Sequence, residues 1–394
     1  MSEGDDIIEV KWNSEAWERA ILERTDLGRF GDRGNLVLFT PRTLLVDSGA
    51  AQDDGVQRQL LRRNARRSDQ LAAQTAESLG LTLFTIPDDQ LLDAVQDIRR
   101  LVPGSASLDH VWLPGPNSVH GDDLPAPSEN PGDIPGASSA GTALAIHVLD
   151  TGIAPDVPFA VESGPADVEV PDEDEDDNRD HAAGHGTHVA GIVARTAPAA
   201  RIVARRLMKT PVGMASELET ARALAEAGRK GANIINCSFG GHTLFDAPPL
   251  ATERALAQLP RGTVVVASAG NSGTERPNWP AASKRVVAVG SVARDERSGE
   301  WKQTDFSNHG YWVDCCAPGV AIDSTFLHWD GGDDEPVFDG FAAWTGTSFS
   351  SPAVAAAIAR YATDNGVEPS LAAWHVVHDP SLPRIGTVGT LVDP

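Results

Sequence analysis

Short apolar runs that end in a polar residue recur along the last two thirds of the chain. One spans residues 143–150 and ends at Asp150; two others span 233–241 and 264–271, and the last ends at Asn271. Runs of this length are typical of strands buried in a sheet. Because open α/β sheets bind their ligands at the carboxyl ends of their strands, Asp150 is expected to lie at a site.

Two apolar helical patterns begin at residues that can do chemistry. The first begins at His185, within a glycine-rich segment, and the second begins at Ser348. A side chain in the first turn of a helix can project toward the strand ends. A helix N-terminus also presents free N–H groups and a positive dipole end, which suit an oxygen that becomes negatively charged. The pattern therefore directs both residues toward the edge of the sheet that carries Asp150.

These residues lie in three short motifs: Asp-Thr-Gly at 150–152, His-Gly-Thr-His-Val-Ala-Gly at 185–191, and Gly-Thr-Ser-Phe-Ser-Ser-Pro at 346–352. A serine hydroxyl is a poor nucleophile at neutral pH, so acyl-transfer enzymes activate it with a histidine base and a carboxylate behind the histidine. The order Asp, His, Ser along the chain is that of subtilisin. Over residues 142–361 the chain resembles the subtilisin-like serine proteases.

The resemblance implies an α/β fold in which a mainly parallel sheet forms the middle of three layers. It implies a serine endopeptidase in which Ser348 attacks the scissile carbonyl, His185 carries the proton, and Asp150 orients the imidazole. Asn271 matches the residue that the family aims at the oxyanion. The implied reaction passes through an acyl-enzyme and needs no chemical cofactor.

Substrate binding is implied for two further segments. In the family, an extended substrate pairs with the strand that ends in Ser-x-Gly-Gly, and the first specificity pocket lies between that strand and the segment at 267–271. The implied substrate-binding residues are Ser238, Phe239, Gly240, Gly241, Ala269 and Gly270. Strand addition of this kind needs an exposed edge. Glu275 and Arg276 are expected near the pocket floor, and the preferred residue stays open between a large apolar and a charged side chain.

Two other histidines fit structural roles better than metal binding. His188 follows His185 by three residues, close to the spacing of metal ligands on a helix, but no glutamate or third ligand accompanies the pair. His147 lies inside the apolar run at 143–150 and is expected to be packed. No metal ligand is therefore assigned to a histidine.

Composition bears on the compartment. The chain has 394 residues, of which 41% are hydrophobic, and only three are cysteines. This number cannot form a disulfide framework, and it fits a reducing compartment. No basic start with an apolar core and no apolar run of about 18 residues is present, so neither a secretory signal nor a membrane span is expected. The sequence predicts a cytoplasmic protein, with release by lysis or by another export route as the alternative.

The formal net charge of -24 makes nucleic-acid binding improbable. Part of the charge is concentrated at residues 171–180, between the motif aspartate and the motif histidine, with a second acidic loop at 330–339. The first loop has three interpretations: a solvated loop, a calcium site, or an attractor of basic substrates. The strong calcium site of secreted relatives is expected to be missing, because the segment after the His185 helix is short.

Three parts are predicted along the chain: an N-terminal α+β domain at 1–113, a linker at 114–139 and a catalytic domain at 140–394. Strands are expected at 35–47 and 81–86, and helices at 55–79 and 88–102. The linker is rich in Pro, Gly, Ser and Asp and is expected to be extended, exposed and cleavable. The N-terminal domain is either a prodomain or a recruitment or sensor domain.

Five arginines form a basic cluster in the N-terminal domain. The simplest interpretation is that the cluster docks onto the acidic catalytic domain, and the alternative is that it binds phosphate or nucleic acid. The members of this basic cluster are Arg58, Arg62, Arg63, Arg66 and Arg67.

Three functions remain open. The first is a serine endopeptidase, a zymogen if the N-terminal domain restrains it. The second is a capped homologue that acts as a binding switch, and the third is a partner-activated protease that processes one substrate. An intact set of four catalytic positions argues against a scaffold. A broad degrader should cut casein, whereas a dedicated processor should leave casein intact.

Overall fold

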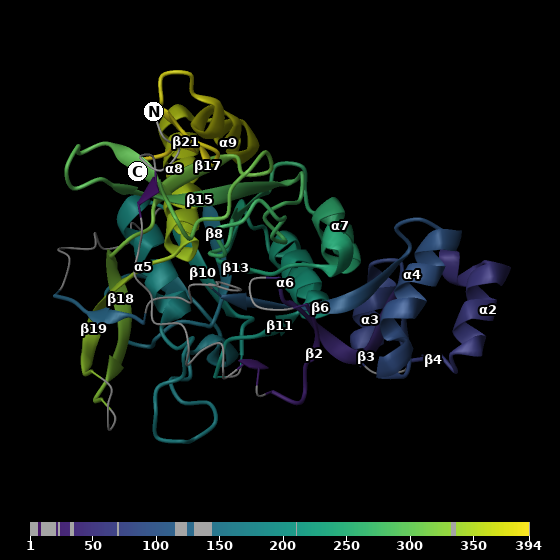
Figure 1. The fold of residues 1–394 in the computed structure, drawn as a ribbon. Coiled ribbons are helices and arrows are strands. Elements are labelled where there is room, and N and C mark those ends of the chain that lie inside the picture. The colour runs from purple at the N-terminus through teal and green to yellow at the C-terminus, as the bar shows by residue number, and fades with distance from the viewer. Residues whose placement is uncertain are drawn as a thin grey trace.

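The computed structural model describes residues 7–8, 21–22, 24–31, 35–68, 71–114, 124–129, 144–209, 211–331 and 336–393. The described chain contains two units. The N-terminal unit comprises the described residues from 21 to 114, and the C-terminal unit comprises those from 144 onward. Figure 1 shows the N-terminal unit at the right of the larger C-terminal unit.

A mainly parallel sheet forms the centre of the C-terminal unit. Its strands follow the order β9, β10, β8, β12, β14, β15, β17, β21, β20. Neighbouring strands in this order are parallel, except for β21 and β20, which are antiparallel. Outside this order, β16 pairs with β15 in the antiparallel sense, and β1 pairs with β16 in the parallel sense. The strands are β1 Ile7–Ile8, β8 Ala145–Asp150, β9 Val161–Glu162, β10 Arg201–Arg206, β12 Ile234–Cys237, β14 Val264–Ser268, β15 Val286–Arg294, β16 Trp301–Thr304, β17 Cys315–Pro318, β20 Arg384–Ile385 and β21 Gly389–Leu391.

Helices cover both faces of this sheet, as predicted. Alternate residues of β8 belong to different cores: Ile146 and Val148 pack with α5 and α8, whereas Leu149 packs with α6 and α7. This period of two follows from the alternation of side chains along a strand, and it produces three layers (Figure 1). The helices are α5 His185–Thr196, α6 Glu217–Arg229, α7 Leu250–Gln258, α8 Thr347–Asn365 and α9 Pro369–His378.

The N-terminal unit is an antiparallel sheet with helices against it. The strand order is β6, β3, β5, β4, with β2 beside β3, and the core includes Leu44, Val56 and Ile98. The elements are β2 Gly28–Phe30, β3 Val37–Asp47, α2 Asp54–Arg62, β4 Arg66–Arg67, α3 Leu71–Ser78, β5 Leu81–Thr85, α4 Leu91–Leu101 and β6 Ala106–Pro114.

One predicted helix is wrong. The segment 55–79 forms two helices, α2 and α3, that are separated by the short strand β4. Asn64 has a φ of 52°, in the left-handed region, so the helix cannot continue through it. Strand β6 was not predicted at all, although all nine of its residues are buried.

Strand β6 also pairs with the C-terminal unit. It runs antiparallel to β11, Ala215–Ser216, where Trp112 lies opposite Ala215, and to β13, Phe239–Gly240, where Leu113 lies opposite Gly240. Figure 1 shows β6 reaching from the N-terminal unit to this region. The edge that was predicted to be exposed for substrate is therefore already occupied by a strand of the same chain.

A small sheet lies at the other side of the C-terminal unit. It consists of β18, Ile322–Trp329, β19, Phe338–Trp344, and β7, Ala126–Pro127. Strand β7 belongs to the predicted linker, and it pairs antiparallel with β19. Most of the linker, at 115–123 and 130–139, lies outside the described residues, so its exposure and the domain boundaries stay predictions.

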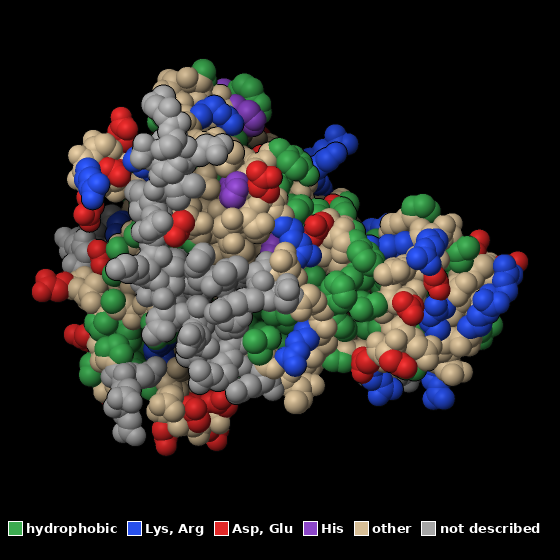
Figure 2. Space-filling view, viewed as in Figure 1, with side chains coloured by type: hydrophobic (Ala, Val, Ile, Leu, Met, Phe, Trp, Pro, Cys, Tyr) green, Lys and Arg blue, Asp and Glu red, His purple; other side chains and the backbone are tan. Residues whose placement is uncertain are grey.

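The basic cluster forms ion pairs within its own unit. Arg63 pairs with Asp97, and Arg67 Nη2 lies 2.7 Å from Glu77 Oε1. Figure 2 shows basic side chains, all of them arginines, spread over the N-terminal unit at the right. Docking of the basic cluster onto the catalytic domain therefore stays a prediction. Across the boundary between the two units, Arg254 forms an ion pair with Asp47, at 2.5 Å.

Candidate active site

Asp150 and His185 are joined by a hydrogen bond. Asp150 is the last residue of β8 and His185 is the first residue of α5, and His185 Nδ1 lies 2.7 Å from Asp150 Oδ1. Both side chains are buried, at 1% exposure. When Nδ1 donates to the carboxylate, Nε2 is the basic nitrogen of the neutral ring. The pair thus has the orientation that a general base requires.

Glycines allow the helix to approach the strand end this closely. A Cβ at Gly186 would lie 2.3 Å from the carbonyl oxygen of Gly152 and 3.1 Å from Cβ of Asp150. Gly184 caps α5 with a φ of 86°, a conformation that favours glycine. The glycine-rich start of this helix is therefore a packing requirement of the site.

Ser348 lies in the first turn of α8 and contacts the strand region at Ser238. Its Oγ donates to the carbonyl oxygen of Ser238 at 3.2 Å, and Ser238 Oγ donates to the carbonyl oxygen of Ser348 at 2.7 Å. The next residue is Phe349, and the centroid of its ring lies 5.4 Å from the centroid of the His185 ring. The structure thus brings the three motif residues to one region, the C-terminal ends of β8 and β12 and the N-termini of α5 and α8.

Asn271 is oriented by the residue before Ser348. Its Oδ1 accepts hydrogen bonds from Thr347 N at 2.9 Å and from Thr347 Oγ1 at 2.8 Å. Thr347 Oγ1 in turn accepts from Gly270 N at 3.1 Å. Because the amide oxygen is held by these donors, Nδ2 is the donor side of the group. This is the orientation that an oxyanion donor needs.

The two segments predicted to wall a specificity pocket lie against Asn278. A Cβ at Gly240 would lie 2.5 Å from Asn278 Nδ2, and one at Gly270 would lie 3.1 Å from Asn278 Cγ. Arg276, which was predicted near the floor, instead donates to Asp246 and to the carbonyl oxygen of Thr243. Asn278 is thus a buried amide beside both segments, whereas a charged floor that includes Glu275 stays a prediction.

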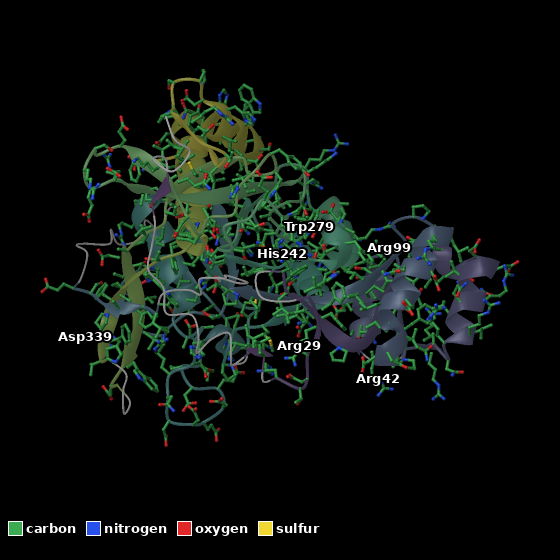
Figure 3. The ribbon with its side chains drawn as sticks, in the orientation of Figure 1. Arg29, Arg42, Arg99, His242, Trp279 and Asp339 are labelled. Carbon is green, nitrogen blue, oxygen red and sulfur yellow. The ribbon has the colours of Figure 1, made fainter. Side chains whose placement is uncertain are left out.

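The other residues that were predicted to bind substrate are buried or form hydrogen bonds with the backbone of neighbouring segments. Phe239 is buried within β13, Ala269 N donates to Val289 O at 2.9 Å, and Gly241 forms a two-way bridge with Trp279, with both bonds at 2.9 Å. Figure 3 labels Trp279 and His242, which lie beside this bridge. His242 Nδ1 donates to Pro277 O at 3.0 Å, and burial lowers the pKa of His242 to about 4.

His188 and His147 are buried, in keeping with their predicted structural roles. His188 packs against the rings of Phe349 and Trp344, at centroid distances of 4.6 and 5.9 Å. Burial holds the pKa of His188 well below its usual range, and burial with nearby arginines lowers that of His147 to about 4. Both rings are therefore neutral near pH 7.

Sequence reasoning missed the residues that hold the site together. Asn308 accepts hydrogen bonds from Ser272 N and Thr274 N and donates to Ala269 O, so it fixes the loop that carries Asn271. Thr347 and Glu169 act in a similar way near the other motif residues. No local pattern marks Asn308 or Glu169, because their partners lie far away in the sequence, whereas Thr347 lies within the motif at 346–352.

The acidic loop brings three carboxylates together. Oxygen atoms of Asp172, Asp174 and Asp176 lie within 4.8 Å of one another, and this is the only such group of potential metal ligands among the described residues. Asp180 in the same loop accepts from Glu173 N at 2.9 Å, and burial raises the pKa of Asp180 to about 7. Calcium binding stays a prediction, as do the solvated-loop and substrate-attractor interpretations. Part of the second acidic loop, 332–335, lies outside the described residues.

The three cysteines are free and buried. In the described part of the chain, no helix combines the length and the apolar character that a membrane span requires.

A three-layer α/β fold with an aspartate, a histidine and a serine gathered at its strand ends defines the class of subtilisin-like serine proteases. The subtilase family model matches residues 141–375, and the chain belongs to this family. The thermophilic serine proteinase of Bacillus sp. (strain AK1) is 37% identical over 198 residues, which cover 47% of this chain and 44% of that protein. Thermitase of Thermoactinomyces vulgaris is 32% identical over 228 residues, which cover 55% of this chain and 73% of thermitase.

Among solved structures, fervidolysin of Fervidobacterium pennivorans has a similar fold. The alignment has a TM-score of 0.57 and 19% identity, and it covers 98% of this chain and 62% of the fervidolysin chain. This chain therefore spans less than half of the thermophilic serine proteinase and about three fifths of fervidolysin.

Proposed function

We propose that this protein is a serine endopeptidase whose catalytic residues are Asp150, His185, Ser348 and Asn271. The observation that carries the proposal is the 2.7 Å hydrogen bond between Asp150 and His185, next to a serine at the N-terminus of α8. Membership of the subtilase family supports the same chemistry.

The proposed reaction has two halves. Ser348 Oγ attacks the substrate carbonyl carbon while His185 Nε2 accepts the hydroxyl proton, and the imidazolium then gives this proton to the leaving amine as the C–N bond breaks. Water attacks the resulting ester with the same base and releases the acid and the free serine. Asp150 keeps the proton on Nδ1 throughout, because its Oδ1 accepts from that nitrogen.

The oxyanion is proposed to lie between two donors. One is Asn271 Nδ2, which is set by the contacts of Oδ1 with Thr347, and the other is the backbone N–H of Ser348 at the start of α8. Donors fixed before the reaction stabilise developing charge without reorganisation. Substrate would pair with the edge at Ser238 to Gly241, and Asn278 would limit the size of the side chain bound beside Gly240 and Gly270.

We further propose that the N-terminal unit restrains the enzyme by keeping β6 on the substrate edge. The pairing of Leu113 with Gly240 supports this, as do two buried polar contacts with α6. Asp109 Oδ1 accepts from Leu218 N at 3.0 Å, and His110 Nδ1 donates to Glu217 Oε2 at 2.8 Å. Such contacts are satisfied only while the unit is docked.

Docking should weaken as the pH rises. Burial, with a smaller contribution from Glu217, raises the pKa of Asp109 to about 7 in the docked state, whereas an exposed aspartate titrates near about 4. The docked state therefore holds an extra proton between these values, and docking is strongest below about pH 4 and is progressively weakened up to about pH 7.

This pH dependence can be measured with a fluorophosphonate probe. We expect the labelling rate of the native chain, divided by that of an Asp109→Asn variant, to rise between pH 5 and pH 8. The ratio cancels the pH dependence of the labelling chemistry itself, which both proteins share. A ratio that stays constant over this range would contradict the role of Asp109.

A capped protease that processes one partner, or a binding switch, is the second candidate, and the occupied substrate edge favours it. Casein separates the candidates. A general endopeptidase degrades casein once β6 is displaced, whereas a dedicated processor leaves casein intact even after limited proteolysis of the 115–139 region.

The decisive experiment for the proposed function is labelling of the purified chain with the same probe, before and after that limited proteolysis. Labelling at Ser348, located by peptide mass, is expected under at least one condition. A chain that is not labelled under either condition is not a serine hydrolase. A cytoplasmic location, the calcium site and the zymogen state are separate proposals that this experiment does not address.

A further inference from the structure

Glu169 is a buried carboxylate that lies beside the Asp150–His185 pair. It belongs to the segment between β9 and α5, and its side chain is 6% exposed. The backbone of this segment is tied to the turn after β8, because Ile153 N donates to Asp167 O and Glu169 N donates to Ile153 O, both at 3.0 Å. Glu169 is therefore held between the strand that carries the aspartate and the helix that carries the histidine.

Three hydrogen bonds converge on this carboxylate. Oε1 accepts from Thr151 Oγ1 at 2.5 Å and from Gly184 N at 2.9 Å, and Oε2 accepts from Thr187 Oγ1 at 2.7 Å. Thr151 immediately follows Asp150, whereas Gly184 and Thr187 flank His185 and Gly186. The two oxygens of one side chain thus connect the aspartate turn to the first turn of α5.

The hydrogen positions require an acceptor at this place. Thr151 Oγ1 accepts from Gly186 N at 2.8 Å, and Thr187 Oγ1 accepts from Ala154 N at 2.9 Å. Each hydroxyl has one hydrogen, and both hydrogens point to Glu169. Burial raises the pKa of Glu169 while the three hydrogen bonds oppose that shift. A carboxylate can accept from all three donors at once, whereas a glutamine would turn an N–H toward one of them.

We propose that Glu169 is a positioning residue that sets the geometry of the Asp150–His185 hydrogen bond by tying Thr151 to the first turn of α5. The inference rests on the proposed catalytic roles of Asp150 and His185, but Glu169 itself has no part in the proposed reaction. Glu169 does not touch the substrate, so its loss changes the turnover step and leaves substrate binding nearly unaltered.

The first test does not depend on turnover. In a Ser348→Ala background, which prevents self-digestion, the Nδ1 proton of His185 should give a far-downfield NMR signal because it is hydrogen-bonded to a carboxylate. Adding Glu169→Ala is expected to shift this signal upfield or broaden it beyond detection, and adding Glu169→Gln should change it less. Glu162→Gln is the matched control, since Glu162 pairs with Arg201 at 2.9 Å on the surface. An unchanged signal in the folded Glu169→Ala protein would overturn the proposal.

The second test separates positioning from general stability. With a fluorogenic peptide, Glu169→Ala is expected to lower kcat on the order of 100-fold with KM within about twofold, because small misplacements of reacting groups have effects of this size. Thr151→Val removes one link of the same connection. If Glu169 acts through Thr151, the double variant should be about as slow as Glu169→Ala alone. Additive losses, or a lower Tm with unchanged kcat, would contradict the proposal.

The outcomes distinguish this inference from the proposed function. A native chain that shows the downfield signal but is never labelled by a fluorophosphonate disproves the protease and leaves the role of Glu169 intact. A chain that is labelled normally after Glu169→Ala disproves the positioning role and leaves the protease intact.

Discussion

Alanine in place of Ser348 is expected to lower kcat on the order of 10⁶-fold, because the nucleophile and its base act as one unit. The hydroxyl lies in the first turn of α8, where its Oγ donates to the carbonyl oxygen of Ser238 at 3.2 Å. Removing one oxygen atom leaves that buried contact region nearly unchanged, so the variant should fold and retain its Tm. Peptide hydrolysis under substrate saturation, with the proteolytically nicked form of each protein, measures the effect.

The same variant tells whether the N-terminal unit is removed by the enzyme itself. Intact mass should show loss of roughly the first 110 to 135 residues in the native chain only, if the unit is a self-removed prodomain. A unit that stays attached in both proteins would instead be a permanent regulatory domain. Ser350→Ala is a suitable control, since Ser350 donates to Ala317 O and lies on the same helix. Equal activity of the Ser348→Ala and native proteins would disprove the proposed nucleophile.

The second large effect is expected at Asn271. Replacement by alanine should lower kcat by about 10² to 10³-fold with little change in KM, since the lost donor acts on charge that develops only in the transition state. The side chain is fully buried and its oxygen accepts two hydrogen bonds from Thr347. Steady-state kinetics on one peptide, with kcat and KM determined separately, measures the change.

An aspartate at position 271 gives a sharper comparison. Its oxygen could still accept from Thr347, but its second oxygen would repel the oxyanion, so kcat should fall at least as far as in the alanine variant. Thr347→Val removes one of the two hydrogen bonds to Asn271 Oδ1 but keeps the backbone bond and the Nδ2 donor, so it should cost less. A rise in KM with unchanged kcat in Asn271→Ala would show that the residue binds ground-state substrate instead.

The elements of the C-terminal unit could be predicted because local patterns specify them. The apolar runs at 143–150 and 264–271 contain β8 and β14; α5 begins at His185 as predicted, and α8 begins at Thr347, one residue before the predicted Ser348. The N-terminal unit was predicted less well. The left-handed Asn64 breaks one helix, and β6 carries Asp109 and His110, whose burial is compensated only by distant partners on α6 and beyond.

The residues of the site also fall into those that the sequence predicted and those that it did not. Asp150, His185 and Ser348 lie in motifs whose order indicates acyl-transfer chemistry, whereas Asn271 was assigned through the family resemblance. The structure brings all four to one edge of the sheet. Glu169 and Asn308 lie in no motif. The occupied substrate edge was also missed, because pairing of β6 with β13 joins residues that are more than a hundred positions apart.

The sequence by itself determined the family and, through the family resemblance, the four positions proposed as catalytic, because motifs depend on residue type, order and short-range periodicity. Only the tertiary structure decided which acceptor holds each donor, which strand pairs with the predicted substrate edge, and that Asn278 lies against both segments of the predicted pocket. Hydrogen bonds and packing depend on distances between atoms, and segments far apart in the chain acquire those distances only when the chain folds.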